Sequence, residues 1–219
     1  MGRHAGWIAA ASGLAQQQGN APHIILFPEI AFDKEAFLKK VRASVEQDGF
    51  CVIVASEGAQ DKDGNFLSAL GSVDAFGHQQ LGGLAPVLAG MVKDSLGYKY
   101  HWAVADYLQR SARHIASQVD LDQAFALGQA AADLAMSGKN ALMPTIVRQS
   151  SKPYKWTIGE VALKDVANVE KKMPREYITT DGFGITDAAR EYLSPLIQGE
   201  AYPNYINGLP DYLNSTDKS

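Results

Sequence analysis

Cysteine is nearly absent from this sequence, and the chain also lacks long apolar runs and a strong charge of either sign. Its one cysteine, Cys51, cannot form a disulfide within the chain and cannot build a cysteine metal cluster. No apolar run approaches the ~18–20 residues that a membrane span needs. Twenty basic against 24 acidic side chains give a net charge of −4, which argues against a nucleic-acid binder that works by bulk electrostatics.

The first residues also lack the apolar stretch of a signal peptide. We therefore expect a cytoplasmic protein with neither nucleic acid nor a membrane as its partner. The five histidines show neither an HExxH motif nor another paired ligand spacing, so we expect no metal site made by this chain alone. The composition is otherwise ordinary, with 46% hydrophobic and 20% charged residues over 219 positions. Composition thus indicates the compartment and leaves the chemistry open.

Apolar periodicity predicts helices and strands that alternate along the first 150 residues. Buried strands are expected at 23–27, 50–55, 100–105 and 141–147. Helices are expected at 3–18, at 33–48 between Asp33 and Gly49, at 84–96 before Gly97, and from Asp120 or Asp122 to Ser137. This alternation predicts an α/β fold, a layered and mostly parallel sheet flanked by helices.

The pattern weakens after residue 150. Residues 156–163 indicate an edge strand, and residues 186–197 indicate a helix that a proline interrupts. An extended surface tail is expected from Tyr202 onward. We therefore divide the chain into an α/β portion that carries the binding residues, 1–150, and a carboxyl-terminal segment that packs on it, 151–219.

Polar side chains follow three of the predicted strands, where ligands bind in open α/β sheets. They lie at 28–30, 56–58 and 106–110, and Glu29 and Arg110 are the informative members. Glu29 would accept hydrogen bonds from sugar hydroxyls, and Arg110 would hold a phosphate through two parallel bonds. The alternative is that these residues cap helices or form surface pairs. The first interpretation predicts a site for a phosphorylated, polyhydroxylated ligand.

Other polar residues have simpler explanations. Glu57 with Glu29 would resemble a glycosidase acid/base pair, although two glutamates after neighbouring strands are more often loop anchors. A basic cluster is interpreted as a solvated face; its members are Lys164, Lys171, Lys172 and Arg175. Residues 182–184 (Gly-Phe-Gly) are typical of a turn, since a lone Gly-x-Gly does not indicate nucleotide binding.

Several spaced motifs resemble the phosphofructokinase family. Residues 1–9 (MGRHAGWIA) are similar to its MGRxxGxxA motif, and Pro28-Glu29 to its PE motif. Residues 77–110 resemble its later sugar-phosphate segment, in which Tyr107 replaces the histidine of the ATP-dependent branch and Arg110 keeps the arginine. The Tyr-x-x-Arg form, with residues 172–177 (KMPREY), looks like the pyrophosphate-dependent branch.

The resemblance implies a substrate and six binding residues. Met1, Gly2 and Arg3 would contact fructose 6-phosphate, and Glu29 would bind one of its hydroxyls. Tyr107 and Arg110 would hold its 6-phosphate. The whole protein would transfer a phosphoryl group from diphosphate to the 1-hydroxyl of this sugar in glycolysis, with Mg²⁺ and as a homodimer or higher homo-oligomer.

The sequence also departs from the family. It contains neither the TID motif with the catalytic aspartate nor the GGD segment for the donor and magnesium. It therefore resembles only the carboxyl-terminal half of such an enzyme, so the fold would be incomplete, with no catalytic residue in this chain and Mg²⁺ bound through the absent half. We expect the chain alone to be inactive. ATP as the donor, and a non-catalytic sugar-phosphate-binding or regulatory module, stay open as alternatives.

Overall fold

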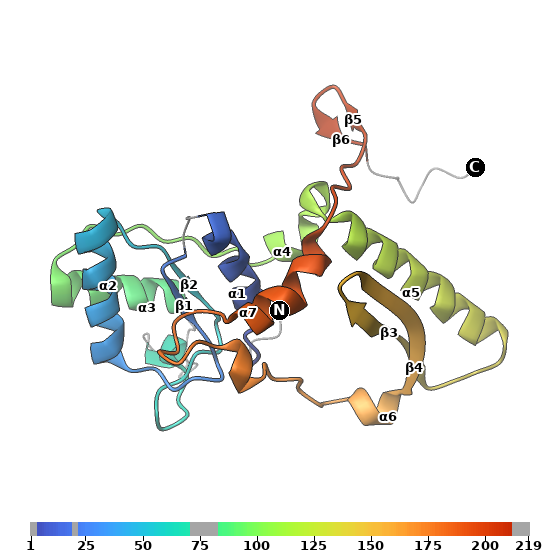
Figure 1. Cartoon of the computed structure of the whole chain (residues 1–219), viewed down its shortest axis with the longest axis horizontal. Helices are drawn as coiled ribbons and strands as arrows, with labels where there is room; N and C mark the ends of the chain where they lie inside the picture. The colour runs from blue at the N-terminus through green and yellow to red at the C-terminus, as the bar shows by residue number, and fades with distance from the viewer. Residues whose placement is uncertain (1–3, 19–21, 71–82, 212–219) are drawn as a thin grey trace, which may run out of the picture. The chain divides into compact units, whose positions relative to one another are not determined.

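The structure is a computed structural model, and it describes residues 4–18, 22–70 and 83–211. The chain forms two compact units that alternate along the sequence (Figure 1). Unit 1 contains Met1–Ala105 and Glu170–Arg190, and unit 2 contains Asp106–Val169 and Glu191–Ser219. These units have other boundaries than residue 150, and the functional division into residues 1–150 and 151–219 stays a prediction.

A parallel pair of strands forms the centre of unit 1. β1 (Ile24–Leu26) lies beside β2 (Ile53–Ala55), and Ile24 is paired with Ile53. All three residues of β1 are buried, as expected for a strand that is covered on both faces. Both strands lie within their predicted ranges.

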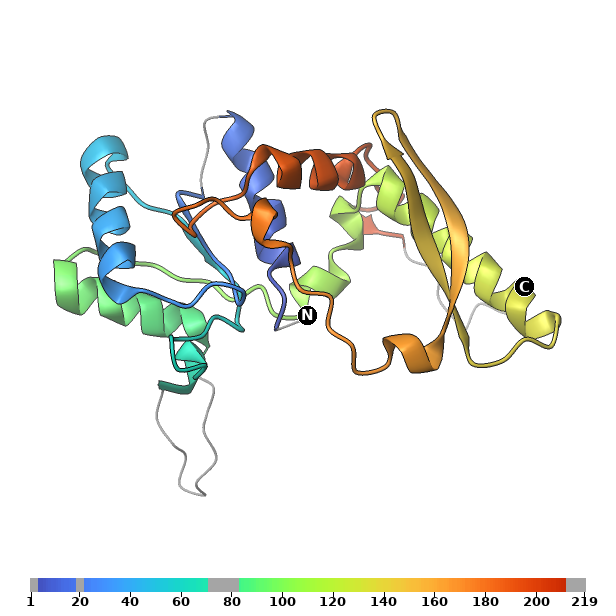
Figure 2. The ribbon, with the colours of Figure 1, turned by 60° about the horizontal axis from the view of Figure 1, so that its bottom comes forward.

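Helices cover both faces of this pair (Figures 1 and 2). α2 (Lys34–Asp48) and α3 (Leu84–Leu96) form an apolar core with Ile24 and Leu26. The side chain of Ile25 points to the opposite face, because successive strand residues alternate, and there it approaches Gly13 of η1. α1 (Trp7–Ala11) and η1 (Ser12–Gln18) provide that second layer. The predicted α/β class is confirmed, with a 3₁₀ turn ending the first helix.

The ends of the two long helices in unit 1 are set by local chemistry. The Asp33 carboxylate accepts hydrogen bonds from the amides of Glu35 and Ala36 at 2.9 and 3.0 Å, which satisfies two donors at the start of α2. Gly49 and Gly97 end α2 and α3 with φ of 80° and 71°, a conformation that glycine adopts without steric cost. These boundaries were predicted and are confirmed.

The predicted strand at 100–105 is wrong. The structure has no strand there, and the side chains of Tyr100, Trp102 and Val104 are exposed. Apolar residues alternate along this segment, as in a strand with one buried face. However, no neighbouring strand among the described residues offers them hydrogen bonds, and pairing decides whether a strand forms.

Unit 2 is built on an antiparallel hairpin. β3 (Leu142–Ser151) pairs with β4 (Tyr154–Ala162), and Ile146 lies opposite Ile158. A strand was predicted at 141–147 as part of the parallel sheet. The observed pairing is antiparallel because only two residues separate the strands, whereas parallel strands need a long crossover. The predicted edge strand at 156–163 corresponds to β4.

The long helix of unit 2, α5 (Gln118–Met136), begins earlier than predicted. Its cap is Ser117, whose hydroxyl accepts a hydrogen bond from the amide of Asp120 at 3.1 Å. Asp120 therefore lies in the first turn, where an acidic side chain is favoured, rather than at the cap. The predicted caps, Asp120 and Asp122, were both wrong, because periodicity alone did not locate the first turn of this helix.

Short elements complete the two units. They are η2 (Leu67–Leu70), α4 (Leu108–Ser111), η3 (Arg113–Ile115), α6 (Leu163–Val166), η4 (Arg175–Tyr177), α7 (Asp187–Leu193), η5 (Ser194–Ile197), β5 (Tyr205–Ile206) and β6 (Leu209–Pro210). The helix predicted at 186–197 changes to 3₁₀ at Ser194, where Pro195 prevents α-helical bonding. The predicted tail contains the small β5–β6 hairpin.

Arg148 holds the hairpin of unit 2 to the carboxyl-terminal segment. Its guanidinium lies 4.7 Å from the centre of the Tyr154 ring and 4.2 Å from that of Tyr192. It also donates a 2.7 Å hydrogen bond to the Tyr192 carbonyl, and Gln123 of α5 donates to the Tyr154 hydroxyl at 2.7 Å. Polar and cation–π contacts therefore connect three segments of this unit.

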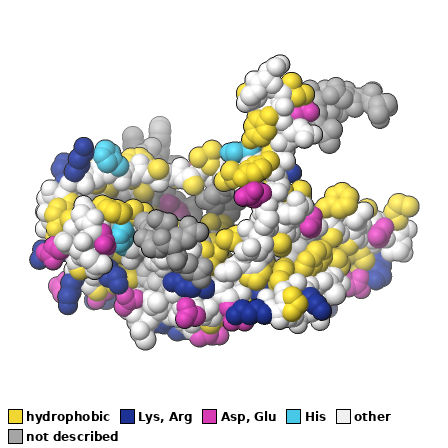
Figure 3. Space-filling model, turned by 45° about the horizontal axis from the view of Figure 1, so that its top comes forward, with side chains coloured by type: hydrophobic (Ala, Val, Ile, Leu, Met, Phe, Trp, Pro, Cys, Tyr) yellow, Lys and Arg dark blue, Asp and Glu magenta, His cyan; other side chains and the backbone are white. Residues whose placement is uncertain are grey.

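Unit 2 has little apolar core. Among its described residues, Leu193 and Ala201 are the buried hydrophobic ones, and α5 has no buried residue. Phe125 and Met136 of α5 are 66% and 89% exposed. Figure 3 shows many hydrophobic side chains at the surface. No helix among the described residues is long and apolar enough to cross a bilayer.

A turn at residues 179–183 contacts α2 and β1 in unit 1. The Asp181 carboxylate accepts hydrogen bonds from Lys40 Nζ at 2.7 Å and from the Thr179 hydroxyl at 2.6 Å, and the Phe183 carbonyl accepts from the Ile25 amide at 2.9 Å. Partial burial works to raise the pKa of Asp181. Hydrogen bonds from Lys40, Thr179 and the Phe183 amide outweigh it and lower that pKa to about 2. The turn predicted at 182–184 is confirmed.

We predict that Asp181→Asn removes a stabilisation that depends on pH. Because the pKa of Asp181 falls from 3.8 to about 2, its carboxylate stabilises the fold above about pH 4, and this contribution is lost as the pH falls toward 2. The side chain is 47% exposed, so the variant should lower the free energy of unfolding by less than about 1 kcal/mol at neutral pH. Urea unfolding at neutral and acidic pH measures this difference.

The exposed Asp94 of α3 offers a matched control, Asp94→Asn, for which we expect little change at any pH. The difference between wild type and Asp181→Asn should shrink as the pH falls below about 4. A difference that stays constant with pH would contradict the electrostatic role of Asp181.

Candidate functional site

The carboxylate of Glu29 is the centre of the candidate site. Glu29 follows β1 directly after Phe27 and Pro28, at the strand end where α/β sheets bind ligands. Its Oε1 atom accepts two backbone hydrogen bonds, from the Gly6 amide at 3.0 Å and from the Met173 amide at 2.9 Å. Its Oε2 atom is buried and has no hydrogen-bond partner among the described residues. A buried carboxylate oxygen without a donor favours a ligand that supplies one.

Gly6 allows this close arrangement. A Cβ atom at Gly6 would lie 2.8 Å from Glu29 Oε2 and 2.8 Å from a ring carbon of Phe27. The glycine therefore lets the start of the chain approach the carboxylate, and this explains its place in the MGRHAG motif.

The start of the described chain also binds the segment 170–177. Trp7 Nε1 donates to the Lys171 carbonyl at 2.7 Å, and the Trp7 ring meets that of Tyr177 edge to face at 6.0 Å between centres. The Lys171 ammonium lies 5.7 Å from the centre of the Trp7 ring. His4 Nδ1 bonds the Glu170 carboxylate. These contacts place Met173 beside Glu29, although 144 positions separate them in sequence.

The structure describes three of the six predicted site residues, and these three belong to two units. Met1, Gly2 and Arg3 lie outside the described residues. Glu29 belongs to unit 1, whereas Tyr107 and Arg110 belong to unit 2, before and within α4. That these six residues gather around one ligand stays a prediction.

Tyr107 lies at the start of α4 and is 67% exposed. Its carbonyl accepts hydrogen bonds from the amide and the hydroxyl of Ser111, at 3.1 and 3.2 Å. Asp106 precedes it with φ of 42°, a left-handed conformation that non-glycine residues adopt rarely. The chain thus turns sharply before the predicted phosphate-binding residues.

Glu57 lies in the turn after β2, where the Ser56 amide donates to the Leu26 carbonyl at 3.0 Å. This bond joins the ends of the two parallel strands and is consistent with an anchored loop. A paired acid/base role with Glu29 stays untested.

All four members of the basic cluster are exposed, as expected for a solvated face, and two of them also have partners in the structure. Arg175 donates to the carbonyls of Ile178 and Thr179 at 2.7 and 3.1 Å, and Lys171 lies against Trp7. The role of Met173 was missed, because its contribution is a backbone amide that any residue other than proline provides. The similarity of residues 172–177 to the pyrophosphate-dependent branch was the available signal.

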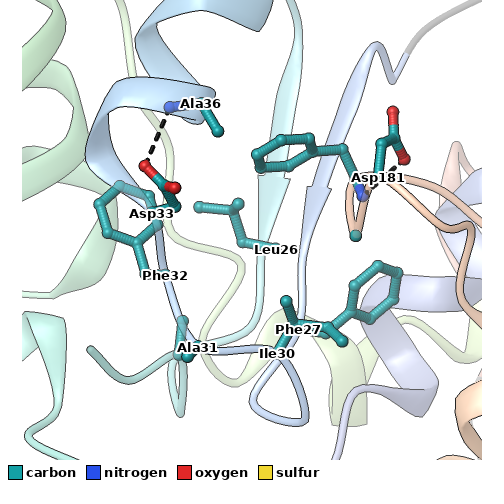
Figure 4. A pocket seen from close by; sticks show the side chains of 11 residues that line it. Leu26, Phe27, Ile30, Ala31, Phe32, Asp33, Ala36 and Asp181 are labelled. Atoms are coloured by element: carbon teal, nitrogen blue, oxygen red, sulfur yellow. Dashed lines mark hydrogen bonds between the residues drawn. The ribbon is translucent and has the colours of Figure 1, made fainter. Parts of the chain in front are cut away.

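A cavity of about 150 Å³ lies near the start of α2 (Figure 4). Leu26, Phe27, Phe32 and Phe183 line it together with Asp33 and Asp181. Both carboxylates already accept hydrogen bonds, Asp33 at the cap of α2 and Asp181 in the turn above. The cavity is therefore lined mainly by apolar side chains, and both of its carboxylates already take part in the local structure.

No group of three histidine, cysteine, aspartate or glutamate residues among the described ones could hold a metal ion. The described part of the chain therefore offers no metal cage built from its own side chains alone.

Comparisons with known proteins agree with the motifs. Residues 1–135 match the family model "Phosphofructokinase". The chain is 61% identical over 211 residues to the pyrophosphate–fructose 6-phosphate 1-phosphotransferase of Halomonas elongata, and 58% identical over 214 residues to that of Methylococcus capsulatus. These alignments cover 96% and 97% of this chain and 50% and 51% of the relatives. The chain thus spans about half the length of the curated relatives it matches.

A solved structure is similar over the same extent. The pyrophosphate-dependent phosphofructokinase of Nitrosospira multiformis is 57% identical, with a TM-score of 0.84, over 97% of this chain and 50% of that one.

The replacement Gly6→Ala tests the packing around Glu29. The added methyl group meets both the carboxylate and the buried Phe27 ring at 2.8 Å, so we predict that the free energy of unfolding falls by about 1–3 kcal/mol. Chemical unfolding measures this change.

Gly90→Ala is its control. Gly90 lies within α3, and a Cβ atom there meets nothing within 4 Å. We expect this variant to gain about 0.5–1 kcal/mol, because alanine is the better helix former. Similar changes in both variants would show that steric contact at Gly6 does not decide the outcome.

Proposed function

This chain belongs to the phosphofructokinase family, and we propose that it is the carboxyl-terminal part of a pyrophosphate-dependent 6-phosphofructokinase. The whole protein transfers a phosphoryl group from diphosphate to the 1-hydroxyl of fructose 6-phosphate. The buried oxygen of Glu29, which has no donor among the described residues, carries this proposal within the chain, because a sugar hydroxyl is a neutral donor that suits it.

The binding residues divide the ligand between them. Glu29 accepts a hydrogen bond from a sugar hydroxyl. Met1, Gly2 and Arg3 contact the same sugar. Tyr107 and Arg110 hold the 6-phosphate, since a guanidinium matches phosphate oxygens with two parallel bonds. Phosphate is kept away from Glu29 by charge repulsion. The two ends of the ligand therefore need two chemically different sets of residues.

Diphosphate is the proposed donor. Two relatives that are 58–61% identical to this chain carry that donor in their names, and Tyr107 resembles the form of the pyrophosphate-dependent branch. ATP as donor, or a regulatory sugar-phosphate-binding module, is the alternative, since no donor-binding motif is present in this sequence.

The phosphoryl transfer itself needs groups from outside this chain. Transfer depends on positioning and on neutralising the charge of the phosphates, with a base that takes the hydroxyl proton. We propose that Mg²⁺ and the catalytic aspartate belong to the other half of the whole protein, because the described residues contain no fitting metal ligands. The whole protein is proposed to be a cytoplasmic homo-oligomer.

Unit 2 supports the view that this chain works with further polypeptide. Its described residues bury two apolar side chains, and both Phe125 and Met136 of α5 are exposed. A unit of this size normally buries many more, because hydrophobic burial must offset the entropy of folding. The relatives that share this unit contain about as many residues again. We propose that this additional half covers α5.

We predict that the chain alone forms no fructose 1,6-bisphosphate from fructose 6-phosphate, diphosphate and Mg²⁺. Co-expression with the amino-terminal half of the Halomonas elongata relative should restore diphosphate-dependent activity in the co-purified complex. An enzyme-coupled assay measures the product. Activity of the chain alone would contradict the proposed division, as would a stable complex without activity.

A second prediction concerns the 6-phosphate. Arg110→Ala should raise the dissociation constant for fructose 6-phosphate by about tenfold or more, because it removes a charge-assisted pair of hydrogen bonds. Lys164→Ala, at an exposed position of α6, should change it by less than about twofold. Ligand-induced shifts of the melting temperature measure both constants. Equal effects of the two variants would contradict the role of Arg110.

A further inference from the structure

We propose that Trp7 and the segment 170–177 position the Glu29 carboxylate, and thereby set the preference of the site for a hydroxylated sugar phosphate over phosphate alone. This inference rests on the proposed function, since it explains how Glu29, one of the proposed binding residues, is held in place. Trp7 is a positioning residue here, because it acts through Lys171, Met173 and Glu29.

The orientation of Glu29 depends on both amides that it accepts. The Gly6 and Met173 amides lie 3.0 and 2.9 Å from the same oxygen, Oε1, so together they fix the plane of the carboxylate. With one amide alone, the group can rotate about that single bond. The second oxygen, Oε2, keeps its direction only while Met173 stays in place.

Burial and two hydrogen bonds of neighbouring residues hold Met173. Its own side chain is 4% exposed. On one side of it, the Trp7 indole donates to the carbonyl of Lys171 at 2.7 Å. On the other side, the Thr186 hydroxyl donates to the Glu176 carbonyl, also at 2.7 Å. The chain is thus held by a hydrogen bond on each side of the Met173 amide. The bond from the Trp7 indole, at Lys171, is the nearer of the two in sequence.

Trp7 is joined to this segment twice. Its ring also meets the Tyr177 ring at 6.0 Å, at an interplanar angle of 83°. Trp7 lies one residue after Gly6, which donates the other amide to Glu29. The same residue therefore couples the two donors, one through the peptide bond to Gly6 and the other through the hydrogen bond to Lys171.

The chemistry of the two oxygens explains the preference. Oε1 is satisfied by two neutral amides, whereas the buried Oε2 accepts from a ligand. A sugar hydroxyl donates a hydrogen bond to it, but a phosphate oxygen brings a like charge. Because the donors are fixed before the ligand arrives, binding does not have to order them. Loosening Met173 should therefore weaken sugar recognition and leave phosphate recognition unchanged.

Trp7→Phe tests this proposal, because it removes the Nε1 donor and keeps an aromatic ring against Tyr177. Titrations of the full chain with fructose 6-phosphate and with inorganic phosphate give the two dissociation constants. We expect the constant for fructose 6-phosphate to rise about five- to tenfold, as for one lost hydrogen bond, and the constant for phosphate to stay within about twofold. Trp156 of β4, outside residues 77–110 and the predicted site residues, provides the matched control, Trp156→Phe, with neither constant changed.

An unchanged constant for fructose 6-phosphate in Trp7→Phe would overturn the proposal. So would an equal loss for both ligands, because a general structural effect weakens both.

Amide hydrogen exchange separates this inference from the proposed function. Without ligand, Trp7→Phe should accelerate exchange of the Met173 amide and leave the amides of β1 unchanged. If wild type binds no fructose 6-phosphate at millimolar concentration, the proposed function of this chain loses its support. The exchange result still decides the positioning role of Trp7: acceleration at Met173 supports it, and unchanged protection overturns it.

Discussion

Two backbone amides on a single carboxylate oxygen organise unit 1. Glu29 Oε1 draws together the start of the chain at Gly6 and the segment around Met173. A glycine is needed at position 6 because a side chain there would occupy the space of the carboxylate. The segment 170–177 in turn lies against Trp7 and fixes the second amide. Because both amides bind Oε1, the other carboxylate oxygen, Oε2, is left without a donor among the described residues.

The two units differ in what they can do alone. Unit 1 has a continuous core between α2, α3 and the parallel strands, and it holds its own carboxylate in place. Unit 2 relies on Arg148 between two tyrosine rings and leaves the outer residues of α5 exposed. The predicted phosphate-binding residues lie in this second unit. In a chain that spans half of its relatives, the proposed sugar-hydroxyl acceptor thus lies in the unit with the continuous core, and the proposed phosphate-binding residues lie in the unit with little core.

Local chemistry was predictable from the sequence, and pairing was not. Asp33, Gly49 and Gly97 set helix ends through their own side chains or φ values, so their residue types were informative. Residues 100–105 have the apolar pattern of a strand, yet no partner strand pairs with them among the described residues. Glu29 was singled out because a carboxylate after a buried strand can be read from the residue type, and its role in binding stays a prediction. Met173 was not, because a backbone amide has no residue type and its partner is 144 positions away.

Amide NMR of the full chain during titration with fructose 6-phosphate tests the central claim. This claim is that Glu29 binds the sugar while the Gly6 and Met173 amides hold the Glu29 carboxylate. Both amides donate to the carboxylate that is proposed to accept the sugar hydroxyl, so their resonances should shift together and saturate at the same ligand concentration. The amides of the exposed α6 should not move. Binding that leaves the Gly6 and Met173 resonances unchanged, or no shift at all up to millimolar ligand, would contradict the account.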